Sequence, residues 1–379
     1  MTRRRFLLGA SAAFFSACGV KKGAGYPGYA LIATAGEPSV TVADLTAFRV
    51  TKQIQLGASP SGVLTGIAGG HSLVLTPTAG AIHQLDARLK LMGSRKFADY
   101  VSDFRLGASG TSVYAVCPRE RELIELDGQT LKQIKRHGLT VSPDSLEVSS
   151  EGHVAVWAQS SGQLELIRHD SGKHIFRQLP GAISQAKFRA DGKLLLVASR
   201  HDQCLSVFSV PGLEPMADLP LPMEPKNLCF NADGGQLLVT GPGMDAVAIV
   251  FPYRILEVEQ TVLAGRDPGV MACSGDPTNY LFVASASGSD VCVMNLNTRT
   301  VVGIVGVGQK PRYIAITPDN QYALVLNESS GDVAVIHIAA VEAKISNADH
   351  FRTKSTVSLF TSFPVGSRPV QAAIVPRAI

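Results

Sequence analysis

A unit of short apolar runs separated by turn residues recurs through the C-terminal half of this 379-residue sequence. It is clearest over residues 311–338, where three such runs are broken by Pro318-Asp319-Asn320 and by Ser329-Ser330-Gly331-Asp332. Residues 269–296, 226–250 and 186–210 follow the same order of runs and turns. Short apolar runs bounded by Pro, Asp and Gly are typical of antiparallel strands joined by tight turns. We therefore expect an all-β fold built from repeated sheets.

The repeats begin near residues 183, 226, 269 and 312, which is a period of 43 residues. Four strands in such a period are the spacing of β-propeller blades. Counting along the chain favours eight blades, with seven as the alternative. The first repeat lacks its innermost strand, and a spare apolar run, 370–375, lies near the C-terminus. We predict that this run completes the N-terminal blade, since closure removes an exposed sheet edge.

Three segments, SRPVQAAIVP, QKPRYIAITPDNQYALVLNESSGDVAVIHI and VASASGSDVCVMNLNTRTVVGIVGVG, resemble the YVTN-type repeats of bacterial β-propellers. That pattern has Pro before the inner strand, then Pro-Asp-Gly, for which this chain has Pro-Asp-Asn at 318–320. The resemblance covers residues 183–376 best. It implies a β-propeller fold, related also to WD40-like repeats, but no single function. The family includes surface-layer proteins, lactonase-like hydrolases, haem-d1-binding propellers and quinoprotein subunits.

The first 28 residues are predicted to serve export and not the fold. Residues 1–17 pair basic Arg3-Arg4-Arg5 with an apolar run too short to cross a bilayer, as in a twin-arginine signal peptide. Phe15-Ser16-Ala17-Cys18 resembles a lipobox, with Phe at the position where Leu is usual, and would make Cys18 the lipidated residue. The alternative is ordinary cleavage. We expect a tether over 18–28, one propeller over 29–379, and a lipoprotein anchored to the membrane on the periplasmic side of the cell envelope.

Charge and motif content exclude several function classes. The formal charge is +4, of which the leader supplies three, and no basic stripe indicates nucleic-acid binding. No CxxC, CxxCH, GxSxG or HExxH pattern is present, no GxGxxG follows a strand and opens a helix, and the nine histidines have no metal-ligand spacing, so we predict no cofactor and no metal. Each histidine is interpreted as a surface or strand-edge residue.

Cys229 and Cys273 fall in the inner strands of neighbouring repeats. Cys229 lies four residues before the turn residue Asp233, whereas Cys273 lies three before Asp276. Since side chains alternate along a strand, the two thiols are predicted to point to opposite faces and not to form a disulfide. We expect the cysteines beyond Cys18 to be small buried core thiols, which fits export after folding in a reducing compartment.

The loop that leads into each inner strand and the loop that joins second and third strands share one face of a propeller, at the mouth of its channel. Converging cations on a rigid scaffold favour an anionic ligand. The alternative is that these loops are polar because they are solvated, with Glu224 and Asp267 as counter-charges. The predicted ligand-binding residues are Lys226, Arg266, Lys310, Arg312, Arg368, Arg200 and His201.

We therefore predict a non-catalytic binding or scaffold module at the cell envelope. Its partner would be a protein segment or a small anion, and no catalytic residue is assigned. The alternatives are a lactonase-like hydrolase, for which Arg200-His201-Asp202 with Glu328 is a partial set, and an accessory redox propeller that handles haem or quinone, for which His201 is the candidate ligand. A surface-structure role would favour a cell-wall domain or tandem copies, which this sequence lacks.

Overall fold

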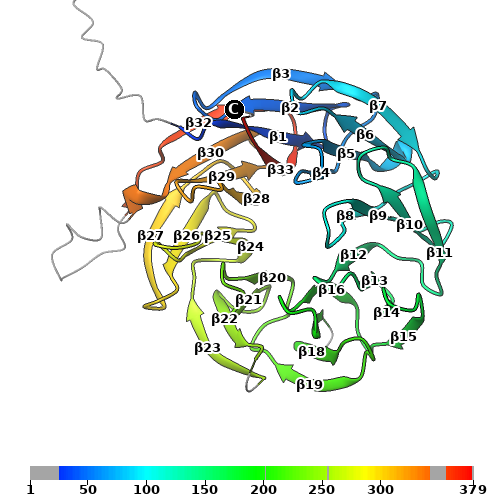
Figure 1. Cartoon of the computed structure of the whole chain (residues 1–379). Helices are drawn as coiled ribbons and strands as arrows, with labels where there is room; N and C mark the ends of the chain where they lie inside the picture. Colours follow the sequence, from blue (N-terminus) through cyan, green and yellow to red (C-terminus); the bar gives the residue numbers. More distant parts are fainter. Residues whose placement is uncertain (1–24, 201, 254–255, 342–355, 378–379) are drawn as a thin grey trace, which may run out of the picture.

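In the computed structural model, which describes residues 25–200, 202–253, 256–341 and 356–377, eight mainly antiparallel sheets are arranged in a ring about a central axis (Figure 1). This confirms the predicted eight-bladed, all-β propeller. Leader residues 1–24 with Cys18, part of the inserted segment and His201 lie outside the described residues. None of the described helices is long and apolar enough to span a membrane.

The first blades follow one another around the ring. Blade 2 is β4 (Gly62–Leu64), β5 (Ser72–Thr76), β6 (Ala81–Leu85) and β7 (Leu91–Lys96), with the 3-10 helix η1 (Pro77–Ala79) after β5. Blade 3 is β8 (Asp103–Leu106), β9 (Ser112–Cys117), β10 (Glu122–Asp127) and β11 (Gln133–Gly138). Blade 4 is β12 (Ser145–Val148), β13 (Val154–Ala158), β14 (Gln163–Ile167) and β15 (His174–Gln178).

The later blades keep the same order from channel to rim. Blade 5 is β16 (Ile183–Phe188), β17 (Leu194–Ser199), β18 (Cys204–Ser209) and β19 (Pro215–Pro220). Blade 6 is β20 (Asn227–Phe230), β21 (Leu237–Thr240), β22 (Ala246–Phe251) and β23 (Glu257–Leu263). Blade 7 is β24 (Pro268–Cys273), β25 (Tyr280–Ser285), β26 (Asp290–Asn295) and β27 (Thr300–Gly306), with β31 (Thr356–Val357) added in parallel. Blade 8 is β28 (Pro311–Ile316), β29 (Tyr322–Asn327), β30 (Asp332–His337) and β32 (Thr361–Pro364).

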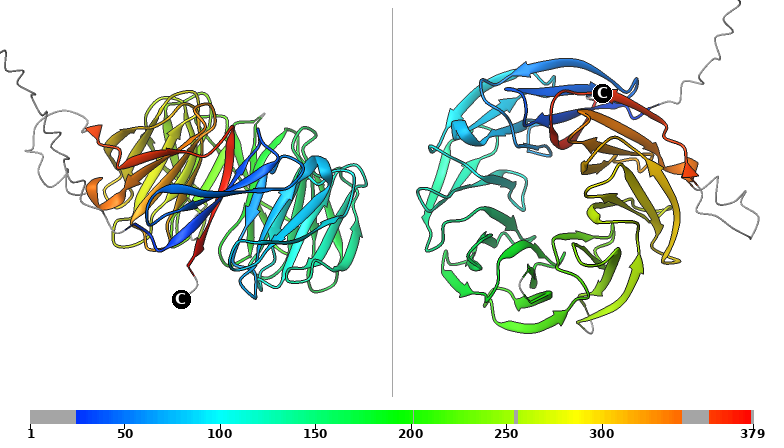
Figure 2. Two further views of the ribbon diagram at one scale, coloured as in Figure 1. Left: turned by 90° about the horizontal axis from the view of Figure 1, so that it is seen from above. Right: turned by 180° about the vertical axis from the view of Figure 1, so that it is seen from behind.

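Blade 1 is built from both ends of the chain. Its strands β1 (Gly28–Thr34), β2 (Ser39–Asp44) and β3 (Arg49–Gln55) are completed on the channel side by the C-terminal strand β33 (Pro369–Pro376). The β1–β33 pairing is antiparallel and places Ile32 opposite Ala372. Both views in Figure 2 show the C-terminal strand lying beside the N-terminal blade. The predicted closure is confirmed.

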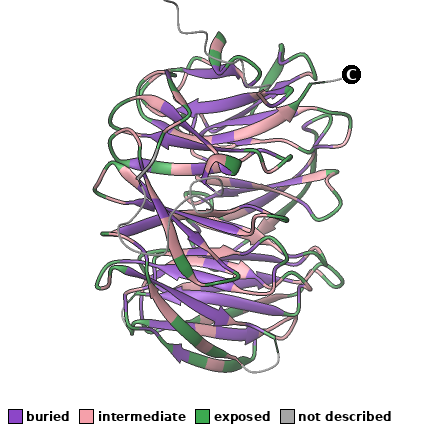
Figure 3. Ribbon diagram, turned by 90° about the vertical axis from the view of Figure 1, so that its left-hand side faces the viewer, coloured by how far each residue is buried: buried purple, intermediate pink, exposed green. Residues whose placement is uncertain are grey.

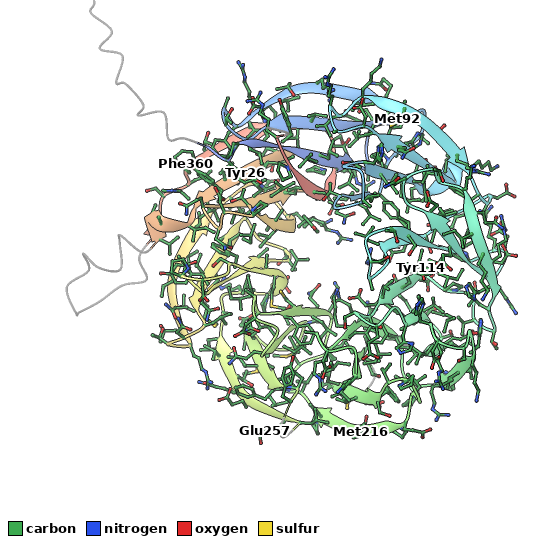
Figure 4. All side chains as sticks on the ribbon, in the orientation of Figure 1. Tyr26, Met92, Tyr114, Met216, Glu257 and Phe360 are labelled. Carbon is green, nitrogen blue, oxygen red and sulfur yellow. The ribbon has the colours of Figure 1, made fainter. Side chains whose placement is uncertain are left out.

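Burial decreases from the middle of each blade towards the rim. The second strands β5, β13, β17 and β29 are buried along their whole length, because neighbouring blades cover both of their faces. The fourth strands β7, β19 and β23 are more exposed than the second strands, and Met92, Met216 and Glu257 on them lie at the outer rim (Figures 3 and 4). The core is thus a ring of apolar layers between blades.

The inner strands face neighbouring blades and not simply the channel. On β28, Ile314 and Ile316 pack in the apolar layer shared with blade 7, whereas Tyr313 and Ala315 pack in the layer shared with blade 1. Alternate residues of an inner strand therefore contact the preceding and the following blade. A residue of one inner strand that points to the following blade therefore meets a residue on the opposite face of the next inner strand.

This geometry corrects the interpretation of Cys229 and Cys273. The two residues do have opposite orientations on their strands, but in a propeller that difference brings them together between blades 6 and 7. Their Sγ atoms lie 4.0 Å apart and both residues are only partly buried, which differs from the predicted full burial, while both thiols are free, as predicted. Cys117, Cys204 and Cys292 are buried, as predicted.

Candidate functional site

Backbone hydrogen bonds tie the mouth loops of neighbouring blades together. The N–H of Lys310, which precedes the inner strand of blade 8, donates to the carbonyl of Gly288 in blade 7 at 2.9 Å. The carbonyl of Lys310 in turn accepts from the N–H of Glu328, in the loop between β29 and β30, at 2.9 Å. These bonds hold the backbone of Lys310 between the mouth loops of blades 7 and 8.

The residue before the inner-strand proline has a left-handed backbone in three consecutive blades. The φ angles are 45° at Asp267, 56° at Lys310 and 54° at Arg368, each directly before Pro268, Pro311 and Pro369. Non-glycine residues rarely adopt this conformation, which costs of order 1 kcal/mol or more each. The repeated geometry places three charged side chains at equivalent positions around the mouth.

One cavity at the mouth, with a volume of about 300 Å³, brings together three of the predicted cations. Lys226 of blade 6 and Lys310 and Arg312 of blade 8 line it, with Asp267 of blade 7 as its carboxylate. We call it the mouth cavity. Its other lining residues are Asn227, Gly241, Pro242, Pro268, Gly269, Val270, Ala286 and Pro311.

A second depression of about 660 Å³ extends from Lys310 to Arg368. Glu328 lies between these cations, with Oε2 3.0 Å from Lys310 Nζ and Oε1 3.5 Å from the Arg368 guanidinium. The Glu328 side chain is 11% exposed. The hydrogen bond from Lys310, together with the charges of Lys310, Arg312 and Arg368, lowers the pKa of Glu328 and outweighs the effect of its burial. Glu328 therefore stays ionised and neutralises part of the mouth charge.

Three of the predicted mouth cations have no carboxylate partner among the described residues. Lys226, Arg266 and Arg312 are exposed and form no ion pair with any carboxylate of the described residues. Arg200, in the loop between β17 and β18, instead pairs with Glu224, its Nε lying 3.7 Å from Oε1. The structure thus gathers Lys226, Lys310 and Arg312 in one cavity, and Lys310 with Arg368 in the next. It places Arg266 outside the residues that line either.

Sequence reasoning missed a chain of charges along the inner strands of blades 3 to 5. Arg105 lies 2.7 Å from Asp103 and 3.8 Å from Glu147, and Lys187 Nζ lies 2.9 Å from Glu147 Oε1. Burial raises the pKa of Asp103 despite the charge of Arg105. The missed signal was a charged residue at the same register of three successive inner strands, with the signs alternating.

Two buried histidines differ from the predicted surface placement. His83 lies on β6, a third strand enclosed between blades, with Nε2 3.0 Å from Thr76 Oγ1, and burial lowers its pKa. His153 is also buried, and its Nδ1 accepts from the backbone N–H of His169 at 3.1 Å. Within the described ranges, no three His, Cys, Asp or Glu side chains are arranged to hold a metal ion.

Comparison with known proteins supports the propeller fold and no narrower family. No family model matches the sequence. The chain is 26% identical over 151 residues to a seven-bladed beta-propeller protein of Mycobacterium tuberculosis, a match that covers 38% of each chain.

Solved structures at much lower identity share the fold. The dihydro-heme d1 dehydrogenase NirN, solved in complex with DHE, has a TM-score of 0.75 at 12% identity, over 92% of this chain and 76% of that one. Apo AztD from Citrobacter koseri has a TM-score of 0.67 at 13% identity, over 92% and 97%. The chain is thus a β-propeller that shares its architecture with proteins of different functions.

Proposed function

We propose that this propeller is a non-catalytic binding module whose mouth cavity holds an anionic ligand. The observation that carries the proposal is the cavity lining, in which Lys226, Lys310 and Arg312 face a single carboxylate, Asp267. Since Glu328 already pairs with Lys310, the charges of Lys226 and Arg312 against Asp267 leave a local excess of one positive charge. Because Lys226 and Arg312 have no carboxylate partner among the described residues, their charge is available to a ligand.

The concave shape of the cavity and the hydrogen-bonded loops around it increase the contribution of these charges to anion binding. Neighbouring charges in a concave protein site interact more strongly than in bulk water, because the protein walls have a lower dielectric constant. The loops are held by hydrogen bonds between blades 7 and 8, so little ordering of the backbone is required on binding. The amide of Asn227 supplies a further polar group at the cavity wall.

The cavity volume of about 300 Å³ lies at the lower end of the range for small-molecule sites. The ligand class that fits is a small multivalent anion, such as a di- or tricarboxylate or a phosphate compound. An acidic side chain presented by a partner protein carries the same chemistry. A thermal-shift titration with pyrophosphate, citrate and an acidic peptide separates these sources.

The variant that tests the site is Lys226→Ala with Arg312→Ala. It should fold normally, since both side chains are exposed, and should lose at least about tenfold in affinity for the anion that stabilises the native chain. The matched control is Arg88→Ala with Lys90→Ala, two exposed cations in the turn between β6 and β7. Equal ligand-induced shifts in both double variants would refute the proposal.

Export and lipid attachment are part of the proposal and rest on the leader sequence. Replacing Arg3 and Arg4 with Lys should leave precursor in the cytoplasm if the twin-arginine route is used. Replacing Cys18 with Ala should release the protein from the membrane. Secretion of the first variant at the normal rate, or unchanged membrane attachment of the second, would contradict this part.

A further inference from the structure

Cys229 and Cys273 are partly buried residues whose thiols lie close to each other, a geometry that the other described cysteines lack. They lie on inner strands β20 and β24 of adjacent blades, with their Sγ atoms 4.0 Å apart. The two cysteines are 44 positions apart in the sequence, and the chain between them passes through blade 6. Cys117, Cys204 and Cys292 are buried within the apolar layers.

We propose that Cys229 and Cys273 form a reversible disulfide that links the inner strands of blades 6 and 7. A disulfide bond is about 2.05 Å long, so the sulfur atoms must approach by about 2 Å. Rotation about the side-chain bonds of the two residues, with a small movement of the strands, covers a distance of this size. The inference does not depend on the proposed anion binding.

The chemistry is exchange with a low-molecular-weight disulfide, for which oxidised glutathione is the probe. The Cys229 thiolate attacks one sulfur of the glutathione disulfide, which breaks its S–S bond and releases one glutathione thiolate. The Cys273 thiolate then attacks the Cys229 sulfur of the mixed disulfide and releases the second glutathione thiolate. The two protons of the protein thiols pass to the two departing thiolates, so that the protein is oxidised and glutathione reduced by two electrons.

The local environment supports Cys229 as the attacking residue. The hydrogen bond from the Cys273 thiol and the nearby charge of Lys187 lower the pKa of Cys229. The interaction with Cys229, together with burial, raises the pKa of Cys273. A thiol with a lowered pKa is more often the thiolate, which is the nucleophilic form. Attack therefore begins at Cys229, with Cys273 as the resolving thiol.

The disulfide would also restrain part of the mouth cavity. Asn227 and Pro268 lie at the mouth ends of β20 and β24, and both line the mouth cavity. Joining the two strands restrains the wall that blades 6 and 7 contribute to this cavity. The disulfide would also restrict the unfolded chain, and a rise in Tm of about 5 °C is expected for a loop of this length in a protein of this size.

The test equilibrates the purified wild-type chain in glutathione buffers of increasing oxidised fraction, followed by alkylation of remaining thiols and peptide mapping. The expected result is a protein lighter by two hydrogen atoms, with the Cys229 and Cys273 peptides linked and a higher Tm. Cys204→Ala, the buried control, should oxidise in the same way, whereas Cys229→Ala should form no link. Alkylation of both thiols in the most oxidising buffer, mixed glutathione adducts alone, or a link between other cysteines would overturn the proposal.

Discussion

Lys310 and Glu328 form a 3.0 Å ion pair at the channel mouth, although they are joined to different strands of blade 8. The backbone carbonyl of Lys310 also accepts from the N–H of Glu328, so the two residues are connected twice. Glu328 is largely enclosed, whereas half of the Lys310 side chain is exposed. The carboxylate therefore holds a cation in place and at the same time competes with any external anion for it.

Replacing Glu328 with Gln should strengthen anion binding roughly fivefold, because it removes a negative charge from the mouth and frees Lys310 and Arg368. The loss of stability should be small, about 0.5 kcal/mol, since the cations are solvent-screened. Isothermal titration and chemical denaturation measure the two effects. Glu259→Gln is the control, as Glu259 on the outer strand β23 pairs at 2.7 Å with Arg299, which lies in the turn before β27. Weaker anion binding in Glu328→Gln would show that the carboxylate contributes to the site.

The lowered pKa of Glu328 also predicts how stability and anion affinity depend on pH. Its pKa is lowered in the folded state, so its ion pairs contribute stability above the pKa of an unfolded glutamate. That contribution is lost as the pH falls through the lowered folded-state value. A fully ionised anion such as sulfate should accordingly bind with constant affinity from pH 8 down to about pH 5 and more tightly below the pKa of Glu328. Tighter binding already between pH 7 and pH 5 would contradict this assignment.

His137 should make stability fall at mildly acidic pH. Burial, with smaller effects from Lys135 and His174, lowers its pKa from 6.5 to about 4. A neutral folded-state histidine contributes stability above pH 6.5, which is lost as the pH falls from 6.5 to about 4. After allowance for solvent screening, we expect a loss of about 1 kcal/mol. His137→Gln should remove that part of the slope in denaturation measured across this range, and an unchanged slope would contradict it.

The charged residues along the inner strands of blades 3 to 5 should contribute to the unfolding free energy jointly and not independently. Glu147→Gln leaves Lys187 and Arg105 without their shared carboxylate and should cost about 2 kcal/mol of unfolding free energy. In a double-mutant cycle with Lys187→Met, the double variant should be more stable than the sum of the two losses predicts. Additive losses would show that the 2.9 Å contact between Lys187 and Glu147 carries no interaction energy.

The pairing of β33 with β1 closes the ring and should contribute strongly to the stability of the protein. Ending the chain at Ser367 removes β33 and exposes the edge of β1 that pairs with it. We expect Tm to fall by more than about 10 °C, with aggregation through the open edge. A chain ending at Arg377 keeps β33 and is the matched control. Unchanged Tm in the shorter chain would contradict the closure.

Much of the fold followed from local signals in the sequence. The 43-residue period, the Pro318-Asp319-Asn320 turn and the spare strand at 370–375 predicted eight blades and their closure, because strands and tight turns are specified by neighbouring residues. The mouth was predictable in part, since the Pro before each inner strand shows which loops share a face.

The remaining features depend on contacts between blades. The Lys310–Glu328 pair and the chain through Glu147 join residues whose spacing in the sequence carries no distance information. For Cys229 and Cys273, the alternation and the absence of a disulfide were predicted correctly, but their proximity was not, because an inner strand of a propeller has a neighbouring blade on each side. Sequence periodicity gives the orientation of a side chain, whereas the arrangement of the blades in the ring determines which residues that side chain contacts.

The most direct test of the central claim is isothermal titration of pyrophosphate into the wild-type chain and into Lys226→Ala/Arg312→Ala, at about 0.01 M and about 0.15 M salt. Binding at the mouth predicts one site in the wild type that weakens as salt rises, and a much weaker site with a smaller salt dependence in the variant. Equal affinity and equal salt dependence in the two proteins would contradict anion binding at the mouth cavity.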